Sequence, residues 1–353
     1  MATADDHAQH TPYPPSPVIT LAALEQPMRR EDLDGDDWPV TWADDDVLYA
    51  AYGDGWGCRP VERHTKRNTG LVRLTGPALA SVGEEVALPW FGGGAEDPNF
   101  KGCGLLAVGG VLYHFLRYQV ADPTCPPRRQ IAAKLVWSSD HGATWQNADY
   151  GPDARAMRLF FDEPDHAFHS PTFLQAGRDY TDAPDDFAYV YSPREDRRRA
   201  NDHLDLTRVP KDQIAERRAY QFFQGRDERG QPRWTADCGA RQPIFAFPGH
   251  VNCGDVVYVA PLDRYLLLTC GGREGVASRL AIFDAPQPWG PWTTVGYVAP
   301  WGTGEGGDAR YDPRLPAKWL SDDGLSGVLL YSDRTPSDKL NLQPVQFRRV
   351  DGR

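Results

Sequence analysis

Short apolar stretches alternate with polar turns along the chain, and one arrangement recurs five times. Each repeat has a short apolar strand, a polar turn and a second apolar or aromatic strand, at 38–55, 102–120, 170–192, 252–272 and 313–333. Successive repeats start 64, 68, 82 and 61 residues apart. Each interval has room for about four strands and their loops, which is typical of one propeller blade. The pattern therefore predicts five blades.

Further strands complete this arrangement. Third strands are expected at 132–140, 204–210 and 278–284. A last strand at 344–350 is expected to pair with one at 18–24 and so to close the ring. The only predicted helix covers 211–223, after Pro210. We expect residues 1–16 to be a flexible N-terminal segment and residues 17–353 to form a single propeller domain.

One turn motif supports this fold class. Ser138–Trp145 reads S-x-D-x-G-x-T-W, the pattern of the Asp-box of sialidase-like propellers. In such a turn an Asp and a Ser or Thr bond the backbone, the Gly takes a positive φ, and the Trp packs between sheets. The fold class expected from the sequence is all-β, a five-bladed β-propeller with one sialidase-like Asp-box.

Composition and charge limit the classes of partner that the protein can bind. The 353 residues are 41% hydrophobic, which is enough for a substantial core. The net charge of −11 argues against nucleic acid as a partner. No apolar run reaches the roughly 20 residues that a membrane span needs. The N-terminus lacks a secretory pattern. The localisation therefore stays unknown, cytoplasmic if no signal existed and secreted if one was removed.

The cysteines indicate no zinc site. Six are scattered without a C-x-x-C pair, which argues against a metal cluster and favours buried thiols over disulfides. No other metal-ligand spacing is recognisable, and no cofactor is expected.

The order of strands in a blade predicts a site. The start of a first strand and the end of a second strand lie on the same face of a propeller. Asp37 and Asp54 flank the first hairpin in this way, and Glu305 lies in a connection at the same face. Two carboxyl groups are what a glycosidase needs for acid and base catalysis. We expect Asp37 to be the base, and Asp54 or Glu305 to be the acid.

Other residues at this face are expected to bind a carbohydrate. Aromatic faces stack on sugars and polar groups hold hydroxyls. The predicted substrate-binding residues are Trp38, Trp56, Lys101, His169, Asn252, Tyr311 and Arg314. Each has a structural alternative: the aromatic residues could belong to the core, His169 could be a satisfied structural histidine, and Lys101 and Arg314 could form structural ion pairs.

Several segments resemble one family. They are 37–45, 48–49, 52–55, 203–204, 207–211, 288–292, 311–316 and 318–319. Together they are similar to the domain of unknown function family 4185 over about residues 35–335. The resemblance implies a five-bladed propeller and, for some relatives, glycoside hydrolase family 183, whose members are endo-D-arabinanases. Asp37 and Asp54 stand in the most family-like motifs.

Three functions follow from these observations. The first is a glycoside hydrolase that cleaves a furanosidic glycan, with D-arabinan as one substrate, by a two-carboxylate mechanism at the channel mouth. The second is a non-catalytic carbohydrate-binding propeller with the same side chains. The third is a protein-interaction scaffold, which an apolar channel mouth would favour. The release of new reducing ends from a glycan separates the first function from the other two.

Overall fold

Antiparallel strands make up nearly all of the regular structure. The computed structural model describes residues 9–58, 66–86, 100–121, 129–148, 159–195, 201–252, 255–271, 278–302, 310–333 and 338–350. In this part of the chain the helical elements are short 3₁₀ turns. They are η1 (Ala78–Ala80), η2 (Arg178–Tyr180), η3 (Lys211–Gln213), η4 (Arg217–Ala219), η5 (Cys238–Ala240), η6 (Ala260–Leu262) and η8 (Ala317–Trp319).

The first two strand units are simple meanders, in which each strand pairs antiparallel with the next. Unit 1 contains β3 (Val40–Trp42), β4 (Leu48–Gly57), β5 (Gly70–Thr75) and β6 (Val82–Val86). Unit 2 contains β7 (Phe100–Val108), β8 (Val111–Val120), β9 (Arg129–Ser138) and β10 (Gln146–Asn147).

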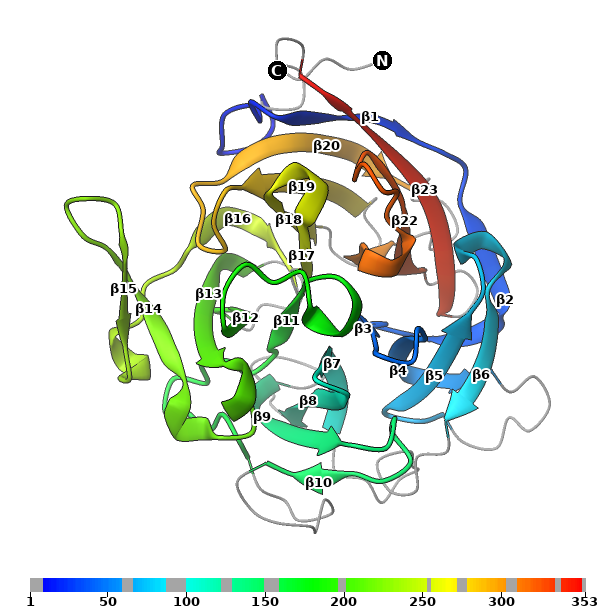
Figure 1. Cartoon of the computed structure of the whole chain (residues 1–353), viewed down its shortest axis with the longest axis horizontal. Coiled ribbons are helices and arrows are strands. Elements are labelled where there is room, and N and C mark those ends of the chain that lie inside the picture. The colour runs from blue at the N-terminus through cyan, green and yellow to red at the C-terminus, as the bar shows by residue number, and fades with distance from the viewer. Residues whose placement is uncertain are drawn as a thin grey trace.

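The third unit is longer and carries a projecting hairpin. It contains β11 (Thr172–Gln175), β12 (Phe187–Pro193), β13 (Asn201–Pro210), β14 (Gln221–Arg226) and β15 (Pro232–Thr235). The β14–β15 hairpin extends from the edge of the molecule (Figure 1). A further strand, β16 (Phe245–Val251), pairs with the start of β13.

The last two units bring the chain ends together. Unit 4 contains β17 (Asp255–Val259), β18 (Arg264–Gly271), β19 (Ser278–Ala285) and β20 (Thr293–Trp301). Unit 5 contains β21 (Tyr311–Arg314), β22 (Ser326–Asp333) and β23 (Lys339–Arg349), and β1 (Ile19–Leu24) pairs with β23. Strand β2 (Met28–Asp36) pairs with both β23 and β4 and so joins units 5 and 1.

The units lie around a common centre, with β3, β7, β11 and β17 inside and strands such as β10 and β20 outside (Figure 1). Side chains join the inner strands. Thr41 Oγ1 of β3 accepts the amide of Ala107 of β7 at 2.8 Å, and Gln175 Nε2 of β11 donates to Leu105 O of β7 at 2.9 Å. Backbone hydrogen bonds form three open sheets of nine, four and ten strands in the described residues.

The predicted hairpins and the pairing of the chain ends are confirmed. Each of the five repeats contains an antiparallel pair, and Ile19 pairs with Arg349. The predicted helix at 211–223 is wrong. Two 3₁₀ turns and the start of β14 replace it. Phe222 and Phe223 point to opposite faces of β14 and both are buried, so the segment is covered on both faces as a strand that pairs with β13 and β15.

Aromatic rings fill the space between units 2 and 3. Phe115 of β8 stacks on Phe173 of β11 with ring centroids 4.7 Å apart, and Phe161 packs on Phe168 at 5.1 Å. All four rings are buried. Burial of such rings is the main stabilising contribution where two sheets pack face to face.

The Ser138–Trp145 turn is closed by its own side chains. Asp140 Oδ1 accepts the amide of Thr144 at 2.8 Å, and Ser138 Oγ accepts the amide of Gly142 at 2.8 Å. Gly142 has a φ of 89°, and Trp145 Nε1 donates to its carbonyl at 3.0 Å. The backbone of the turn is therefore held by the residue types that the motif predicted.

Part of the predicted N-terminal segment lies against unit 4. Ser16 donates its amide to Thr294 O at 2.8 Å, and Thr294 donates its amide to Pro14 O at 2.7 Å. The Tyr13 ring packs on Phe245 and Phe283, and its hydroxyl accepts the amide of Ala246 at 2.9 Å. Residues 9–16 therefore bridge β16 and β20. We call them the N-terminal strap.

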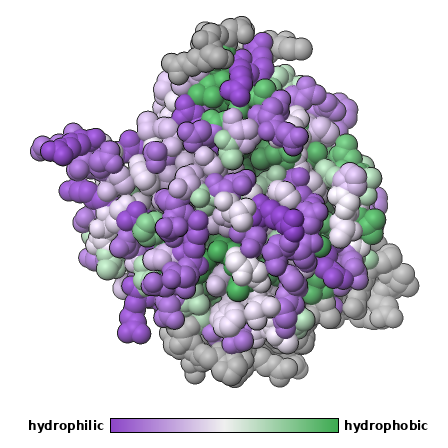
Figure 2. Space-filling model, viewed as in Figure 1, coloured by the Kyte–Doolittle hydropathy of each residue, from purple (hydrophilic) through white to green (hydrophobic). Residues whose placement is uncertain are grey.

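The described cysteines are free thiols. Cys103, Cys238 and Cys270 are buried and Cys58 is half-buried, while Cys125 and Cys253 lie outside the described residues. None of the helical elements in the described part is long and apolar enough to cross a membrane. The face drawn in Figure 2 is largely hydrophilic, with scattered apolar patches.

Candidate active site

Two ion pairs join unit 1 to unit 2 at the end where β3 begins and β4 ends. Arg117 of β8 pairs with Asp37, and Lys101 of β7 pairs with Asp54. The Asp37 side chain is 5% exposed, whereas the Asp54 side chain is 42% exposed. The structure therefore brings three predicted site residues together, and only one of the two carboxylates is open to solvent.

The backbone at this end is held in unusual conformations. Asp37, Asp54 and Asp312 have φ values of 69°, 44° and 53°. These values lie in the left-handed region, which residues other than glycine rarely adopt. Such conformations are costly and tend to gather where a site needs a fixed orientation. Asp37 lies between β2 and β3, Asp54 lies near the end of β4, and Asp312 is the second residue of β21.

A third carboxyl group, Asp36, lies beside this pair. It is the last residue of β2 and pairs with Gly53 of β4. It is buried, and among the described residues its Oδ1 has no hydrogen-bond partner. Burial and the neighbouring carboxylate of Asp37 raise the pKa of Asp36 to about 7, against a smaller opposing effect of Lys101.

Sequence reasoning missed Asp36. The doublet Asp36-Asp37 is visible in the sequence, but nothing in the sequence shows that both side chains are buried at one place. Arg117 could be placed at the same face by strand order, yet it was not among the selected residues. Its pairing with Asp37 was not predictable, because it depends on how two neighbouring units pack.

Other predicted residues lie on the unit 5 side and are bound within the protein. Asn252 donates its side-chain amide to Asp312, and the Tyr311 hydroxyl donates to Asp338 Oδ1 at 2.5 Å. All of these side chains except Asp338 are buried. Asp338 also raises the pKa of Asp36, so this side and the carboxyl cluster of unit 1 are electrostatically linked.

Arg314 has a structural environment. It is 1% exposed, with Nη1 3.5 Å from Asp255 Oδ1 and 3.4 Å from Thr172 Oγ1. It thus ties β21 to β17 and β11. Of the two interpretations from sequence, the structural ion pair fits this burial better than contact with a substrate hydroxyl.

The predicted aromatic and histidine ligands differ in how much of each side chain is exposed to solvent. Trp38 has no exposed surface, and its Nε1 donates to Gly35 O at 2.9 Å. A ring without exposed surface cannot stack on a sugar, so the prediction for Trp38 is corrected to a core role. Trp56 is half-buried, with Lys66 Nζ 5.1 Å from its ring centroid. His169 is buried, and its Nδ1 donates to His166 O at 3.0 Å.

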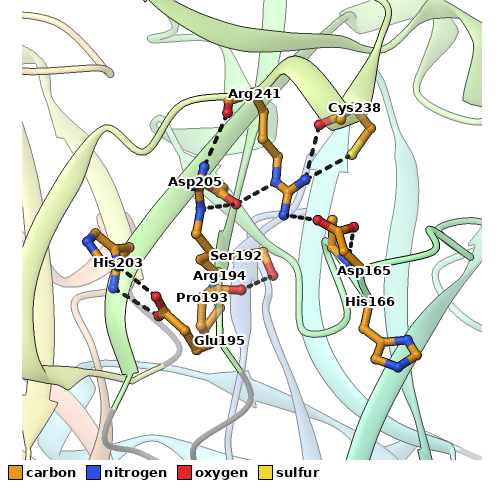
Figure 3. Close-up of polar contacts among 12 residues, drawn as sticks. Asp165, His166, Ser192, Pro193, Arg194, Glu195, His203, Asp205, Cys238 and Arg241 are labelled. Carbon is orange, nitrogen blue, oxygen red and sulfur yellow. Dashed lines mark hydrogen bonds and ion pairs between the residues drawn. The ribbon is translucent and has the colours of Figure 1, made fainter.

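An ion-pair network supports the unit 3 side of this end (Figure 3). Arg241 binds Asp205 at 2.6 Å and Asp165 at 2.7 Å, and Arg194 also binds Asp205, at 2.7 Å. The Asp205 side chain is 1% exposed. Two guanidinium groups on one buried carboxylate fix the segment before β11 against β12 and β13.

One group of possible metal donors lies at the other end of unit 1. Donor atoms of Asp44, Asp45 and His141 lie within 4.8 Å of one another. They belong to the β3–β4 and β9–β10 turns, away from Asp37 and Asp54. His141 Nε2 already bonds Asp44 Oδ1 at 2.9 Å. We therefore assign no metal to this group. Glu305, the other predicted acid, lies outside the described residues.

The family follows from the sequence itself. The model of the domain of unknown function family DUF4185 matches residues 106–311, more than half of the chain. The chain belongs to this family. No curated protein matches the sequence.

Solved structures show a shared fold with this DUF4185 protein. A protein from Bacteroides ovatus has a TM-score of 0.54 and 13% identity, over 88% of this chain and 85% of that one. A protein of unknown function from Dyadobacter fermentans has a TM-score of 0.52 and 13% identity, over 94% and 100%. The α-L-arabinofuranosidase PaAbf62A of Podospora anserina, solved with cellotriose, has a TM-score of 0.51 and 10% identity, over 95% and 98%. At these identities the likeness shows an all-β, propeller-like fold.

Proposed function

We propose that this DUF4185 protein is a glycoside hydrolase whose site is the end of unit 1 at Asp37 and Asp54. The observation that carries the proposal is the contrast between these two carboxylates. Asp37 is buried against Arg117, whereas Asp54 is 42% exposed beside Lys101. Glycosidases use two carboxyl groups in different environments, one ionised and one able to give a proton.

The surroundings of the two carboxylates support a role for each. The guanidinium of Arg117 favours the ionised form of Asp37, which suits a base that activates water. Asp54 has the exposed surface that contact with a glycosidic oxygen requires. Asp36 lies beside them, and burial together with the neighbouring carboxylate of Asp37 raises its pKa to about 7. Asp54 is the acid in this proposal, because a sugar that displaces Lys101 would leave its carboxyl group facing the glycosidic oxygen. Glu305 is the alternative acid.

Resemblance and fold support a furanosidic substrate. The motifs that contain Asp37 and Asp54 resemble those of proteins for which endo-D-arabinanase activity is implied, and an α-L-arabinofuranosidase shares the fold. We therefore propose D-arabinan as the substrate class. Trp56, a half-buried aromatic residue two positions after Asp54, would supply a ring face for a sugar.

We also propose that the molecule is a five-bladed propeller. We interpret the five strand units as five blades, with β1 supplying the outer strand of the last blade, because β1 pairs with β23. We interpret the Ser138–Trp145 turn as an Asp-box, because Asp140 and Ser138 bond its backbone. In this interpretation the proposed catalytic residues lie at one mouth of a central channel.

A non-catalytic carbohydrate-binding propeller is the second candidate. This function is favoured by the ion pair between Lys101 and Asp54, because Lys101 binds the carboxylate of the proposed acid in the resting protein. Such a protein would hold a glycan at the same end without releasing products.

Product release decides between the two functions. Purified protein is incubated with arabinan, arabinogalactan and unrelated glycans, and new reducing ends are measured. We expect the wild type to release reducing ends from furanosidic glycans. The rate of release should fall at least about a hundredfold in Asp37→Asn and in Asp54→Asn. Asp186→Asn changes an exposed residue and serves as the control with full activity. Binding without release by the wild type would support the second function. Full activity in Asp37→Asn would remove Asp37 from the mechanism.

A further inference from the structure

A row of side chains runs outward from Asn252 across the seam between units 3 and 4. His250 lies at the end of β16, Arg279 lies on β19 and Tyr297 lies on β20. Strand β16 leads directly to Asn252, which bonds Asp312 of unit 5. The row therefore begins near Asn252 and Asp312, on the unit 5 side of this end, and leads to β20, an outer strand of unit 4 (Figure 1). We call His250, Arg279 and Tyr297 the seam row.

The rings of the seam row are held in fixed orientations. The His250 ring stacks on Phe247 with centroids 4.1 Å apart and an interplanar angle of 8°, and it meets Tyr297 at 6.5 Å. His10 of the N-terminal strap stacks on Tyr297 at 5.6 Å. His250, Arg279 and Tyr297 each keep partly exposed surface. Ligand binding here would order few additional side chains, which favours affinity.

The hydrogen bonds of His250 define its tautomer. Nδ1 donates to Pro248 O at 2.8 Å, so Nε2 is the acceptor for Arg279 Nη1 at 3.2 Å. Burial lowers the pKa of His250, and the positive charge of Arg279 acts in the same direction. The imidazole is therefore neutral near pH 7, and the guanidinium beside it supplies further N–H donors.

Aromatic faces with a fixed guanidinium are the groups that bind sugar rings and hydroxyls. We infer that the seam row is a distal subsite for a sugar unit of a polymeric glycan whose scissile bond lies at Asp37 and Asp54. The inference rests on the proposed function. Three strand spacings separate β17 from β20, about 15 Å, so a ligand that reaches from the mouth to Tyr297 is longer than one sugar. The seam row therefore favours polymers over short substrates.

Substrate length tests the inference. Kinetics are measured on arabinogalactan and on a p-nitrophenyl arabinofuranoside. For Tyr297→Ala we expect the KM for arabinogalactan to rise about fivefold, in line with one aromatic contact, with unchanged kcat and unchanged kinetics on the small substrate. Tyr297→Phe keeps the ring and should retain the wild-type KM. Trp42→Ala is the control, a half-buried aromatic change at the far end of β3.

The outcomes separate the two proposals. Equal effects of Tyr297→Ala on both substrates, or no effect on either, would overturn the subsite and leave the hydrolase intact. If the wild type hydrolyses nothing, the hydrolase proposal fails, and affinity electrophoresis in gels that contain arabinogalactan then tests the subsite alone. The subsite would be supported if arabinogalactan slows the migration of the wild type and of Trp42→Ala but not that of Tyr297→Ala. Absent or equal retardation would overturn it.

Discussion

Asp36 and Gly53 face each other across β2 and β4, and the carboxylate of Asp36 occupies the space where a side chain of residue 53 would lie. A Cβ atom built on Gly53 would come within 2.8 Å of Asp36 Oδ1 and 3.7 Å of Asp37 Oδ2. Glycine at position 53 thus allows the carboxyl groups to gather beside β4. The site depends on this missing side chain as well as on the acidic residues.

Gly53→Ala should disturb the carboxyl cluster. We expect a lower melting temperature and a loss of glycan hydrolysis, because the new methyl group would displace Asp36 or the strand. Asp36→Ala should partly rescue the stability of Gly53→Ala, since it removes the atom that collides. A double-mutant cycle of melting temperatures measures this coupling. Additive effects would show that the two residues do not compete for the same space.

Asp36 should make stability fall as the pH rises. Its pKa is raised from 3.8 to about 7 in the folded protein, so between these values the folded state holds a proton that the unfolded state has lost. The stabilising effect of that proton is complete below about pH 4 and is lost as the pH rises toward 7.

Asp36→Asn removes this titration. We expect the variant to be more stable than the wild type at pH 8 by about 1–4 kcal/mol, with the difference shrinking toward pH 4. Denaturant titrations at pH 4, 6 and 8 measure it. A difference that does not change with pH would contradict the assignment of the proton to Asp36.

The ion pair of Asp37 with Arg117 should matter for stability as well as for catalysis. Both side chains are less than 10% exposed. Arg117→Met leaves Asp37 buried without this cation and should destabilise the protein by about 3–5 kcal/mol. The double variant Arg117→Met with Asp37→Asn should recover part of that loss. A single variant as stable as the wild type would show that Asp37 has a second sufficient partner.

The Arg241 network on the unit 3 side should be far more costly to break than an exposed pair. Arg241→Met leaves the 1% exposed carboxylate of Asp205 with one cation in place of two, and we expect a loss of about 3 kcal/mol. Arg73→Met breaks the pair with Glu84, whose side chains are 39% and 67% exposed, and should change stability by less than about 1 kcal/mol. Equal melting temperatures for the two variants would contradict this ranking.

Local sequence patterns were sufficient to predict the five hairpins but not the secondary structure of the whole chain. The five hairpins follow from alternating apolar stretches and turn residues, whose effects act over a few neighbours. At 211–223 mixed charges resembled a helix, yet the burial of Tyr220 and Phe222 against other units selected 3₁₀ turns and a strand. Tertiary packing overrode local preference at that point.

For the candidate site, too, some features were predictable from the sequence and others were not. Strand order alone placed Asp37, Asp54 and Lys101 at one end, because the direction of each strand follows from its hairpin. The sequence could not show that Trp38 is fully buried while Trp56 is not, since exposure depends on neighbouring units. Nor could it show that the pKa of Asp36 is raised, because burial and three nearby acidic side chains produce that effect only after folding.

The sequence by itself determined the all-β class, the repeat of hairpins, the meeting of the chain ends and the end of the molecule that carries the acidic residues. The class and the hairpins depend on contacts between residues that are near in the chain, and the meeting of the chain ends follows because a ring of strands must pair its two edge strands. Only the tertiary structure decided the pairing of Asp37 with Arg117, the environment of Asp36 and the seam row from His250 to Tyr297. These depend on distances between separate units, which the chemistry of each residue alone does not set.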